Sequence, residues 1–423
     1  MRVLVWGLGH VGAVNAACLA ELGHDVVGID SRPEAVAAIQ GGRPLMRESG
    51  LHDLVARNVA AGRLRATRDG IPEVRAADVS LVCVGIPESA AGGLSLDPLR
   101  SVAAAIGGGL RGVTRFRHVV ALRSTVAPGV TRGMFREALE TASGERAGDG
   151  FGLACLPEFL REGSAVADFS SPPFLLIGAL DDRSALPLER MTAALERPVH
   201  RVSIEEAELV KLVSNAFHAM KIGFANEIGR LGDALGVDPH RVMEIVRSDT
   251  KLNASAAYLA PGFAFGGSCL PKDVRLLSAD AERRQVALPI LQAVLPSNRA
   301  QLEAALRRIL GLGARRVGVV GLAFKAGTDD LRDSPAVELV AALRQHGLEV
   351  LVHDPDVRID ALSEGSRLYV ESRLPDFREI VCEEIEELFR RCDAVVVAGE
   401  RPEIKAIAER FGFASPVLSL SGP

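Results

Sequence analysis

The stretch MRVLVWGLGHVGAVNAACLAELGHDVVGID, residues 1–30, determines how the first part of this chain folds. An apolar run leads into the glycine pattern GLGHVG, and a helical pattern then leads to a second apolar run that ends in Asp30. This order predicts a strand, a tight turn, a helix and a strand, in which a pyrophosphate approaches the glycines at the positive end of the helix. A carboxylate after the second strand binds the ribose hydroxyls, so Asp30 favours NAD, while Arg32 nearby leaves NADP open. A glycine turn without a ligand is the alternative interpretation of the pattern.

The alternation of strands and helices continues along the chain. Residues 77–85, 117–123 and 151–157 have the apolar character of buried strands, which indicates an α/β fold with a parallel sheet. In a doubly wound sheet the carboxyl ends of the strands face the ligand, so Thr125 is expected near the nicotinamide. An ordinary turn rich in Ser, Thr, Pro and Gly is the other interpretation of that segment.

The segment PEFLREG follows the last of these strands. Glu158 and Glu162 are four residues apart and are expected to share one face of a helix. Paired carboxylates of this kind are more often part of a solvated surface than of a site, so the pattern alone leaves both interpretations open.

Composition limits the classes of protein that remain. The chain has 423 residues, 48% hydrophobic and 24% charged, which predicts two or three ordinary globular domains. A net charge of −5 and 4% aromatic residues argue against a nucleic-acid partner. The six cysteines show neither metal-binding nor disulfide spacing, so we expect no metal and reduced thiols. With no signal peptide and no membrane-spanning run expected, the predicted location is the cytoplasm.

A long helix is predicted in the middle of the chain. Ser203 and Glu206 form a capping-box pattern, and Gly236 is the expected C-terminal cap. At 1.5 Å per residue the helix is about 50 Å long, which suits a spine between domains or a dimer interface. Lys211, Asn215 and His218 lie on one face of this helix and follow the spacing i, i+4, i+7. A polar pocket and a solvated face are equally compatible with this stripe.

A second strand–helix–strand pattern begins at residue 316 and has no GxGxxG. Its long loop contains Lys325 and Arg332, which suit phosphate or carboxylate groups. The chain is therefore predicted to form two Rossmann-like doubly wound lobes joined by a central long helix and a helical middle domain. The expected domains are 1–200 for the dinucleotide, 201–300 for the helical centre and 301–423 for the second lobe, with a cleft between the lobes as the expected site.

The stretch FAFGGSCLPKDV, residues 263–274, sets a thiol in a glycine hinge. An ammonium, Lys272, and a carboxylate, Asp273, follow Cys269 within four residues, which is the setting of a reactive cysteine rather than a structural one. Cys18, Cys83 and Cys155 lie in apolar patterns and are expected to be buried small hydrophobes.

Six motifs in this order resemble the UDP-glucose/GDP-mannose 6-dehydrogenase family over nearly the whole chain. They are GLGHVG, RSTVAPG, PEFLREGSAVADF, ELVKLVSNAFHAMKIGFANEIG, PGFAFGGSCLPKDV and GLAFKAGTDDLRDSP, and several are most like the GDP-mannose 6-dehydrogenase branch. The resemblance implies an enzyme that uses two NAD to oxidise the C6 alcohol of a nucleotide sugar to the uronic acid, with GDP-mannose favoured. It also implies a homodimer through the central helix and a role in polysaccharide biosynthesis.

The resemblance also assigns roles to individual residues. Cys269 is the nucleophile that forms a thiohemiacetal and then a thioester, and a nearby cation such as Lys272 or Lys211 favours its thiolate. Lys211 stabilises the oxyanion, and Asn215 holds a water or the sugar. The proton-handling groups are Asp273, and Glu158 with Thr125 through water. Positions that match nucleotide-sugar contacts are Glu162, Lys211, Asn215, His218, Asn226, Tyr258, Phe263, Gly266 and Lys325. Positions that match the NAD site are Gly7, Gly9, His10, Val11, Gly12, Asp30, Thr125, Lys272 and Arg332.

One segment departs from the GDP-mannose branch. Before PGFAFGG that branch has two tyrosines and then an arginine, whereas this chain has Ala257, Tyr258, Leu259 and Ala260. The loss of a guanidinium removes a bidentate partner for a phosphate or a sugar hydroxyl, so UDP-glucose and UDP-N-acetylmannosamine remain alternative substrates.

Other classes of protein make different demands on the sequence. A hydroxyacid-type dehydrogenase also has a Lys and an Asn four residues apart but needs no cysteine. A short-chain epimerase or dehydratase needs Tyr-x-x-x-Lys, and the fourth residues after the two tyrosines are Gly262 and Arg373. A non-catalytic nucleotide-sugar sensor is the alternative from a different class.

Overall fold

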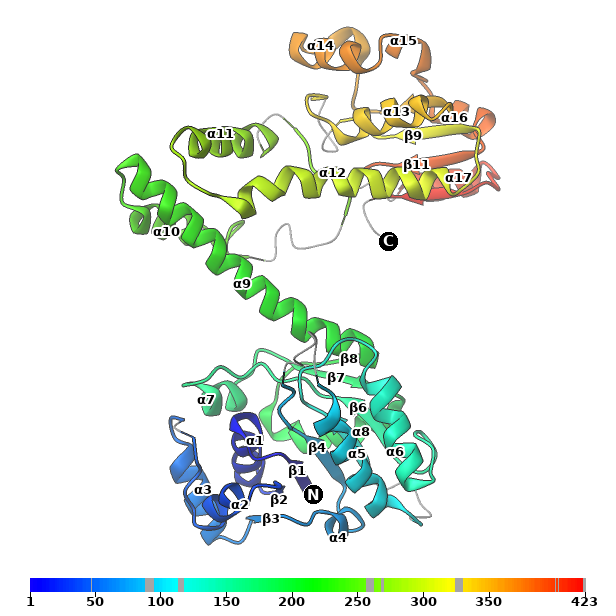
Figure 1. Cartoon of the computed structure of the whole chain (residues 1–423). Coiled ribbons are helices and arrows are strands. Elements are labelled where there is room, and N and C mark those ends of the chain that lie inside the picture. Colours follow the sequence, from blue (N-terminus) through cyan, green and yellow to red (C-terminus); the bar gives the residue numbers. More distant parts are fainter. Residues whose placement is uncertain are drawn as a thin grey trace. The chain divides into compact units, whose positions relative to one another are not determined.

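The computed structural model describes residues 1–46, 48–87, 95–112, 118–255, 262–267, 270–323, 330–399, 401 and 403–420. The chain forms two compact units, Met1–His218 and Ala219–Pro423, and their boundary lies inside one long helix, α9 (Figure 1).

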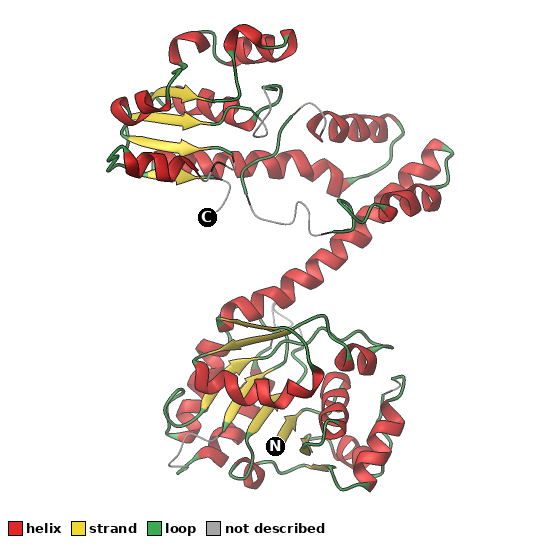
Figure 2. Cartoon of the chain, turned by 180° about the vertical axis from the view of Figure 1, so that it is seen from behind, coloured by secondary structure: helices red, strands yellow, loops and turns green. Residues whose placement is uncertain are grey.

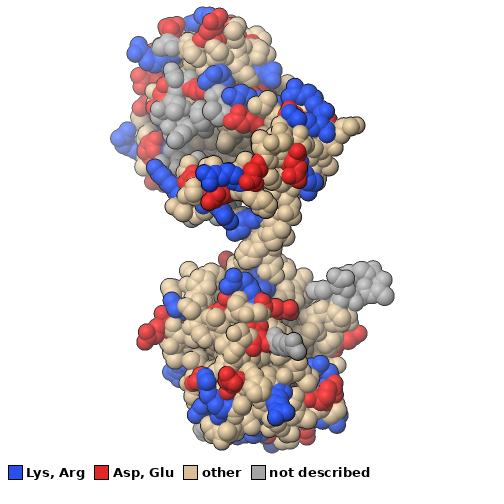
Figure 3. All heavy atoms as spheres, turned by 90° about the vertical axis from the view of Figure 1, so that its left-hand side faces the viewer, with Lys and Arg blue, Asp and Glu red and all other residues tan. Residues whose placement is uncertain are grey.

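No helix in the described part of the chain combines the length and apolar character needed to cross a membrane. Acidic and basic side chains are mixed over the face seen in Figure 3, without an extended patch of either sign.

The first unit is built on an eight-stranded sheet with the order β3-β2-β1-β4-β5-β6-β7-β8 (Figure 2). The strands from β3 to β6 are parallel in the order typical of a dinucleotide-binding Rossmann fold, and β7 is antiparallel to β6. Its elements are β1 (Arg2–Trp6), α1 (His10–Glu21), β2 (Asp25–Ile29), α2 (Pro33–Gln40), α3 (Leu51–Ala60), β3 (Leu64–Thr67), α4 (Ile71–Val74), β4 (Val79–Val82), α5 (Asp97–Leu110), β5 (Val119–Leu122), η1 (Thr131–Phe135), α6 (Arg136–Ser143), β6 (Gly152–Cys155), α7 (Ala165–Ser170), β7 (Leu175–Ala179), α8 (Asp182–Thr192), η2 (Ala193–Leu195), β8 (Val199–Val202) and the start of α9 (Ile204–Leu235).

The two faces of this sheet bury two separate cores. Successive side chains of a strand point to opposite faces, so Val3 and Val5 of β1 pack in one core while Leu4 and Trp6 pack in the other. Residues of α1, α3 and α8 complete the first core, and residues of α5, α6 and the start of α9 complete the second. Apolar residues on both faces are the requirement of a doubly wound sheet, which confirms the predicted fold class.

The second unit contains a four-stranded parallel sheet with the order β10-β9-β11-β12. Helices again cover both faces of the sheet, so the second lobe is also Rossmann-like (Figure 2). Its elements after α9 are α10 (Pro239–Ser248), α11 (Leu270–Arg283), α12 (Pro289–Leu310), β9 (Arg316–Val320), α13 (Pro335–Gln345), β10 (Glu349–His353), η3 (Ile359–Ala361), α14 (Glu364–Arg373), α15 (Phe377–Ile380), α16 (Ile385–Arg391), β11 (Ala394–Val397), α17 (Glu403–Arg410) and β12 (Val417–Ser419).

The predicted limits of α9 are confirmed. Ser203 Oγ accepts the backbone N–H of Glu206 at 3.2 Å, and the Glu206 carboxylate accepts the N–H of Ser203 at 2.7 Å, which is a capping box. The 32-residue helix ends before Gly236, whose φ of +71° suits glycine. Asp238 then caps α10 through the N–H groups of His240 and Arg241, as its place before Pro239 predicts.

A buried ion pair organises the loop after β9 in the second unit. The Asp354 side chain is 1% exposed and accepts the N–H groups of Leu322 at 2.7 Å and Ala323 at 2.9 Å. Arg401, 8% exposed, donates to Asp354 at 3.0 Å and also pairs with Asp356. Because a buried carboxylate needs donors and loop N–H groups need acceptors, this cluster ties the ends of three strands together.

We predict that Arg401→Met destabilises the second unit by about 3 kcal/mol, because the substitution leaves the Asp354 charge buried without its cation. Amide hydrogen exchange of β9, β10 and β11 measures this loss within the unit itself. The matched control is Arg378→Met, whose pair with Asp360 has side chains 63% and 93% exposed and contributes little. Equal effects of the two substitutions would contradict a stabilising role for the buried Arg401–Asp354 pair.

Candidate functional site

The glycine turn after β1 closes tightly on the start of α1. Gly7 has a φ of +94°, and a Cβ on Gly12 would lie 1.8 Å from the Gly7 carbonyl oxygen, so both positions require glycine. A Cβ on Gly9 would meet no atom within 4 Å, which leaves that side of the turn open. In the described chain no side chain caps α1 and its first turn has no acidic residue. The N–H groups and the positive helix end thus fit the pyrophosphate of a dinucleotide.

Asp30 lies at the end of β2, beside this turn. Its carboxylate accepts the Leu8 N–H at 2.7 Å and pairs with the Arg32 guanidinium at 3.1 Å. Burial of Asp30 opposes ionisation, but the hydrogen bonds from Arg32 and Leu8 outweigh it and hold the pKa of Asp30 below its ordinary value. The carboxylate is therefore an anion at the position where a Rossmann fold binds ribose hydroxyls. Arg32 is engaged with this same carboxylate.

His10 contacts a buried carboxylate that the sequence patterns did not reveal. His10 Nε2 lies 2.9 Å from Glu48 Oε2, and the Glu48 side chain is 0% exposed. Glu48 also accepts the N–H groups of Gly163 at 2.8 Å and Ala165 at 3.0 Å. It thus joins the start of α1 to the segment between β6 and α7. Val11, the next residue of α1, packs against the core on that side of the sheet.

A carboxylate of α9 binds the backbone of the segment that follows β5. Thr125 is half-buried in this segment, and Glu208 accepts the N–H groups of Gly129 at 2.6 Å and Thr131 at 2.8 Å. Glu208 is 2% exposed. Sequence reasoning missed this residue, although it lies three residues before Lys211 and so extends the same polar stripe of the helix by one turn.

Lys211 and Glu158 form a nearly buried ion pair. Lys211 Nζ lies 3.1 Å from Glu158 Oε1, and their side chains are 8% and 11% exposed. The ammonium lies 5.5 Å from the centre of the Phe159 ring, and the second oxygen of Glu158 accepts the Leu160 N–H at 2.6 Å. The pair therefore sets an ammonium group and a carboxylate side by side with little exposure to water.

The expectation that Glu158 and Glu162 share a helix face is wrong. Residues 156–161 have no regular structure, and Gly163 has a φ of +87°, which a helix does not accommodate. The hydrogen bond from Leu160 N to Glu158 turns the carboxylate back on its own segment, and Glu162 is exposed. Only Glu158 joins Lys211.

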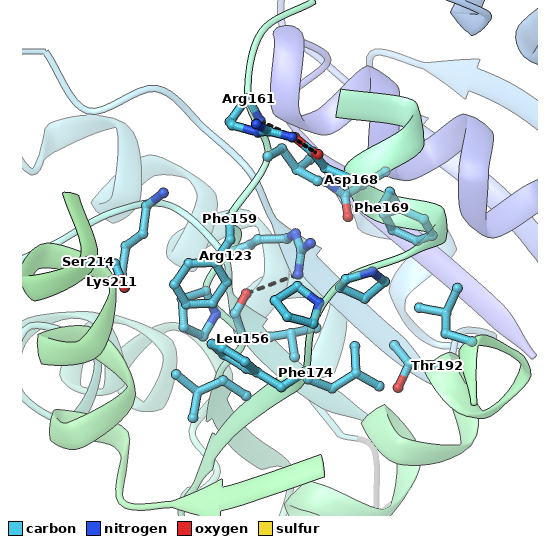
Figure 4. A pocket seen from close by; sticks show the side chains of 18 of the residues that line it. Arg123, Leu156, Phe159, Arg161, Asp168, Phe169, Phe174, Thr192, Lys211 and Ser214 are labelled. Carbon is cyan, nitrogen blue, oxygen red and sulfur yellow. Dashed lines mark hydrogen bonds and ion pairs between the residues drawn. The ribbon is translucent and has the colours of Figure 1, made fainter. Parts of the chain in front are cut away.

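Lys211, Asn215 and His218 line one pocket of about 430 Å³ in the first unit, which favours the pocket over the solvated face that their spacing left open. Figure 4 shows Lys211 on this pocket. The walls are largely aromatic and aliphatic. Arg123, at the end of β5, also lines the pocket and donates to the Leu156 carbonyl at 3.2 Å. Its burial lowers the pKa of Arg123, as expected for a cation removed from water.

The predicted site positions from Asn226 onward lie in the second unit, and their surroundings differ. Lys272 and Asp273 are neighbours in α11 and form an ion pair at 3.6 Å with both side chains about two-thirds exposed (65% and 64%). Arg332 makes a bidentate contact with the Asp330 carboxylate, with hydrogen bonds of 2.9 and 2.7 Å.

The remaining described positions are uncharged. At Gly266 a Cβ would lie 2.3 Å from the Asp333 carbonyl oxygen, so this position requires glycine. Phe263 packs against the core of the second unit, and Asn226 is exposed on α9.

Cys269, Tyr258 and Lys325 lie outside the described residues, as do Ala257 and Ala260. Cys18, Cys83 and Cys155 are buried, as predicted, and Cys382 and Cys392 are buried too. Burial raises the pKa of both Cys18 and Cys83 to about 12. These thiols are therefore protonated and inert at neutral pH.

Comparisons with known proteins agree with this arrangement. Three models of the UDP-glucose/GDP-mannose dehydrogenase family match in succession, namely the NAD binding domain at residues 1–197, the central domain at 205–300 and the UDP binding domain at 318–417.

Individual relatives match over almost the full chain. GDP-mannose 6-dehydrogenase of Pseudomonas putida is 40% identical, and the match covers 100% of this chain and 96% of the relative. UDP-glucose 6-dehydrogenase of Haloferax volcanii is 37% identical, with 97% and 94% covered. A crystal structure of GDP-mannose dehydrogenase from Pseudomonas aeruginosa, a ternary complex, superposes with a TM-score of 0.95 at 38% identity, covering 100% of this chain and 97% of that one. The chain belongs to the UDP-glucose/GDP-mannose dehydrogenase family and is an NAD-dependent nucleotide-sugar dehydrogenase.

Proposed function

We propose that this enzyme oxidises the C6 alcohol of GDP-mannose to the carboxylic acid of GDP-mannuronate. The observation that carries the chemistry is the nearly buried Lys211–Glu158 pair. Lys211 lines one pocket with Asn215 and His218, beside the carboxyl ends of β5 and β6. Similarity over the full chain to GDP-mannose 6-dehydrogenases supports the choice of sugar.

The second oxidation requires a nucleophile, because the carbonyl carbon of an aldehyde cannot lose hydride until a nucleophile has been added to it, and we assign this role to a cysteine. Bound NAD supplies the hydride acceptor, once for each of the two oxidations. After the alcohol has become an aldehyde, the Cys269 thiolate adds to the carbonyl carbon and forms a thiohemiacetal. Loss of hydride leaves a thioester, and water then releases the acid and the thiol. One alcohol, two NAD⁺ and one water give one carboxylic acid, two NADH and two protons.

The remaining groups assist these steps. The Lys211 ammonium stabilises the oxyanion when the thiol and then water add to the carbonyl, and Asn215 orients the water or the sugar. Glu158 with Thr125 and a water, together with Asp273, accepts and returns protons. We assign the nucleotide sugar to Glu162, His218, Asn226, Tyr258, Phe263, Gly266 and Lys325. We assign the dinucleotide to Gly7, Gly9, His10, Val11, Gly12, Asp30, Thr125, Lys272 and Arg332.

UDP-glucose is the second candidate substrate, with the same mechanism. Two observations favour it. The Haloferax volcanii relative, 37% identical, is named for that sugar, and Ala257 and Ala260 stand where the GDP-mannose branch has a tyrosine and an arginine. UDP-N-acetylmannosamine is the third sugar that this segment leaves open.

The proposal assigns a task to each of three domains. Residues 1–200 bind NAD, residues 201–300 form the helical dimerisation domain, and residues 301–423 bind the nucleotide sugar. We place the enzyme in the cytoplasm, where NAD and nucleotide sugars are both available.

The dimer is proposed from the two faces of α9. At 100° per residue, Leu209, Val213 and Met220 fall on one stripe of the helix and Lys211 and Asn215 on the opposite stripe. The three apolar side chains are 49%, 55% and 49% exposed. An exposed apolar stripe on a long helix is typical of an interface, and a second copy of this chain covers it symmetrically.

The function is tested by offering GDP-mannose, UDP-glucose and UDP-N-acetylmannosamine separately to the purified enzyme with NAD. We expect two NADH for each GDP-mannose consumed, counted by absorbance against the sugar nucleotide remaining. Activity only with a UDP sugar would contradict the proposed substrate but retain the chemistry. One NADH per sugar would contradict the four-electron reaction, and no turnover would favour a non-catalytic sensor.

The dimer is tested by light scattering coupled to size-exclusion chromatography. We expect the wild type at twice the chain mass of 44.8 kDa and Met220→Glu at the chain mass, because a charge in an apolar interface is desolvated without a partner. Leu186→Glu, at a site on α8 that is 42% exposed, is the matched control and should remain dimeric. A dimeric Met220→Glu protein would place the interface elsewhere.

A further inference from the structure

Glu48 is a fully buried carboxylate between two parts of the proposed site. Its Oε2 accepts from His10 Nε2 at 2.9 Å and from the Gly163 N–H at 2.8 Å, and its Oε1 accepts from the Ala165 N–H at 3.0 Å. Burial opposes ionisation of Glu48, but the hydrogen bonds from His10 and the two N–H groups outweigh it and hold the pKa of Glu48 below its ordinary value. The side chain is therefore an anion with both oxygens engaged.

The partners of Glu48 belong to segments with different tasks. His10 is the first residue of α1 and stands in the glycine turn that we assign to the dinucleotide. Gly163 and Ala165 close the segment that begins with Glu158, the partner of Lys211. Glu48 itself lies in the connection between α2 and α3, 38 residues from His10 and 115 residues from Gly163. One carboxylate thus joins the cofactor turn to the substrate segment.

The segment from Glu158 to Ala165, called here the substrate segment, has two further anchors besides Glu48. Arg161 donates its backbone N–H to Asp168 at 2.9 Å and its guanidinium to the same carboxylate at 2.7 Å, which fixes the segment to α7. At its other end, Glu158 is held by Lys211. The contacts of Glu48 with His10, Gly163 and Ala165 are therefore a continuous physical connection between the α1 turn and a segment that is held at both ends.

We propose that Glu48 is a positioning residue that couples the binding of the dinucleotide to the binding of the nucleotide sugar. The inference rests on the proposed function, which places these ligands at the α1 turn and at the Glu158 segment. Glu48 acts through His10, Gly163 and Ala165 rather than on either ligand. Closing the α1 turn on a dinucleotide sets the substrate segment in its binding position, and the reverse holds by linkage.

The test uses NADH and GDP-mannose, because these two ligands bind together without reacting. The dissociation constant of NADH is measured by fluorescence with and without saturating GDP-mannose. We expect GDP-mannose to tighten NADH binding about five-fold or more in the wild type. The coupling ratio is the dissociation constant of NADH without GDP-mannose divided by its value with GDP-mannose. In Glu48→Gln this ratio should fall close to one, because the amide NH₂ group of the new side chain faces hydrogen-bond donors and cannot accept from them.

A purely structural role is separated by a matched control. Asp181 also uses its carboxylate to hold a backbone N–H, that of Ser184 at 2.8 Å, and it caps α8, an element that belongs to neither segment. Asp181→Asn should lower the melting temperature to an extent similar to Glu48→Gln and keep the full coupling ratio. Loss of coupling in both variants would show a general effect of destabilisation and would overturn the inference.

His10→Ala breaks the same contact from a side chain that is 21% exposed, so it provides the test if Glu48→Gln does not fold. In His10→Ala the coupling ratio should also fall close to one, and the variant should bind NADH more weakly as well, because we assign His10 to the dinucleotide. In the double variant the ratio should not fall further, because both changes remove one connection.

The outcomes also distinguish this inference from the proposed function. If the wild type binds a UDP sugar instead of GDP-mannose, the substrate proposal fails and the same ratio is measured with that sugar. If the wild type binds no nucleotide sugar, the proposed function fails and this inference fails with it. If both ligands bind and the ratio is one in the wild type, or is unchanged in Glu48→Gln, only the role of Glu48 is overturned.

Discussion

Buried carboxylates that accept backbone N–H groups hold the loops of this protein in place. The pattern recurs at Asp30 with Leu8, at Glu48 with Gly163 and Ala165, at Glu208 with Gly129 and Thr131, and at Asp354 with Leu322 and Ala323. A strand that ends at the ligand edge of a sheet leaves N–H groups without partners, and a buried carboxylate needs donors. The loop N–H groups and the buried carboxylates therefore supply each other's hydrogen-bond partners. The loops are ordered around these carboxylates, which also supply negative charge at the edge of the sheet.

Helix α9 brings these loops to the proposed chemistry. Glu208 holds the segment after β5, and Lys211, one turn later, holds Glu158 of the segment after β6. The same stripe continues to Asn215 on the pocket. The opposite stripe is apolar and exposed at Val213. One helix thus carries a polar face for the site and an apolar face for the proposed partner copy, which explains why its sequence alternates between the two kinds of residue at helical spacing.

Local patterns predicted the parts of the fold that depend on near neighbours. The glycine turn, the capping box at Ser203 and the cap at Asp238 all follow from residues within a few positions of each other. The same spacing put Lys211 and Asn215 on one face of α9, but it did not decide whether that face lines a pocket. Glu48 escaped prediction because its partners are far away in the sequence and are mostly backbone N–H groups, which no sequence pattern marks. The segment after β6 was expected to be helical from the spacing of its two glutamates, but hydrogen bonds to Glu158 and Glu48 hold it in an irregular path.

The proposed thioester between Cys269 and the substrate is tested most directly by rapid acid quenching of the enzyme with GDP-mannose and NAD. Peptide mass spectrometry then looks for the mass of one GDP-mannuronyl group on the peptide that contains Cys269. The thioester mechanism predicts this adduct at millisecond to second times, its cleavage by hydroxylamine, and its absence without NAD or in Cys269→Ser. Full acid formation by Cys269→Ser, or rapid turnover of the wild type with no adduct on that peptide, would contradict the mechanism.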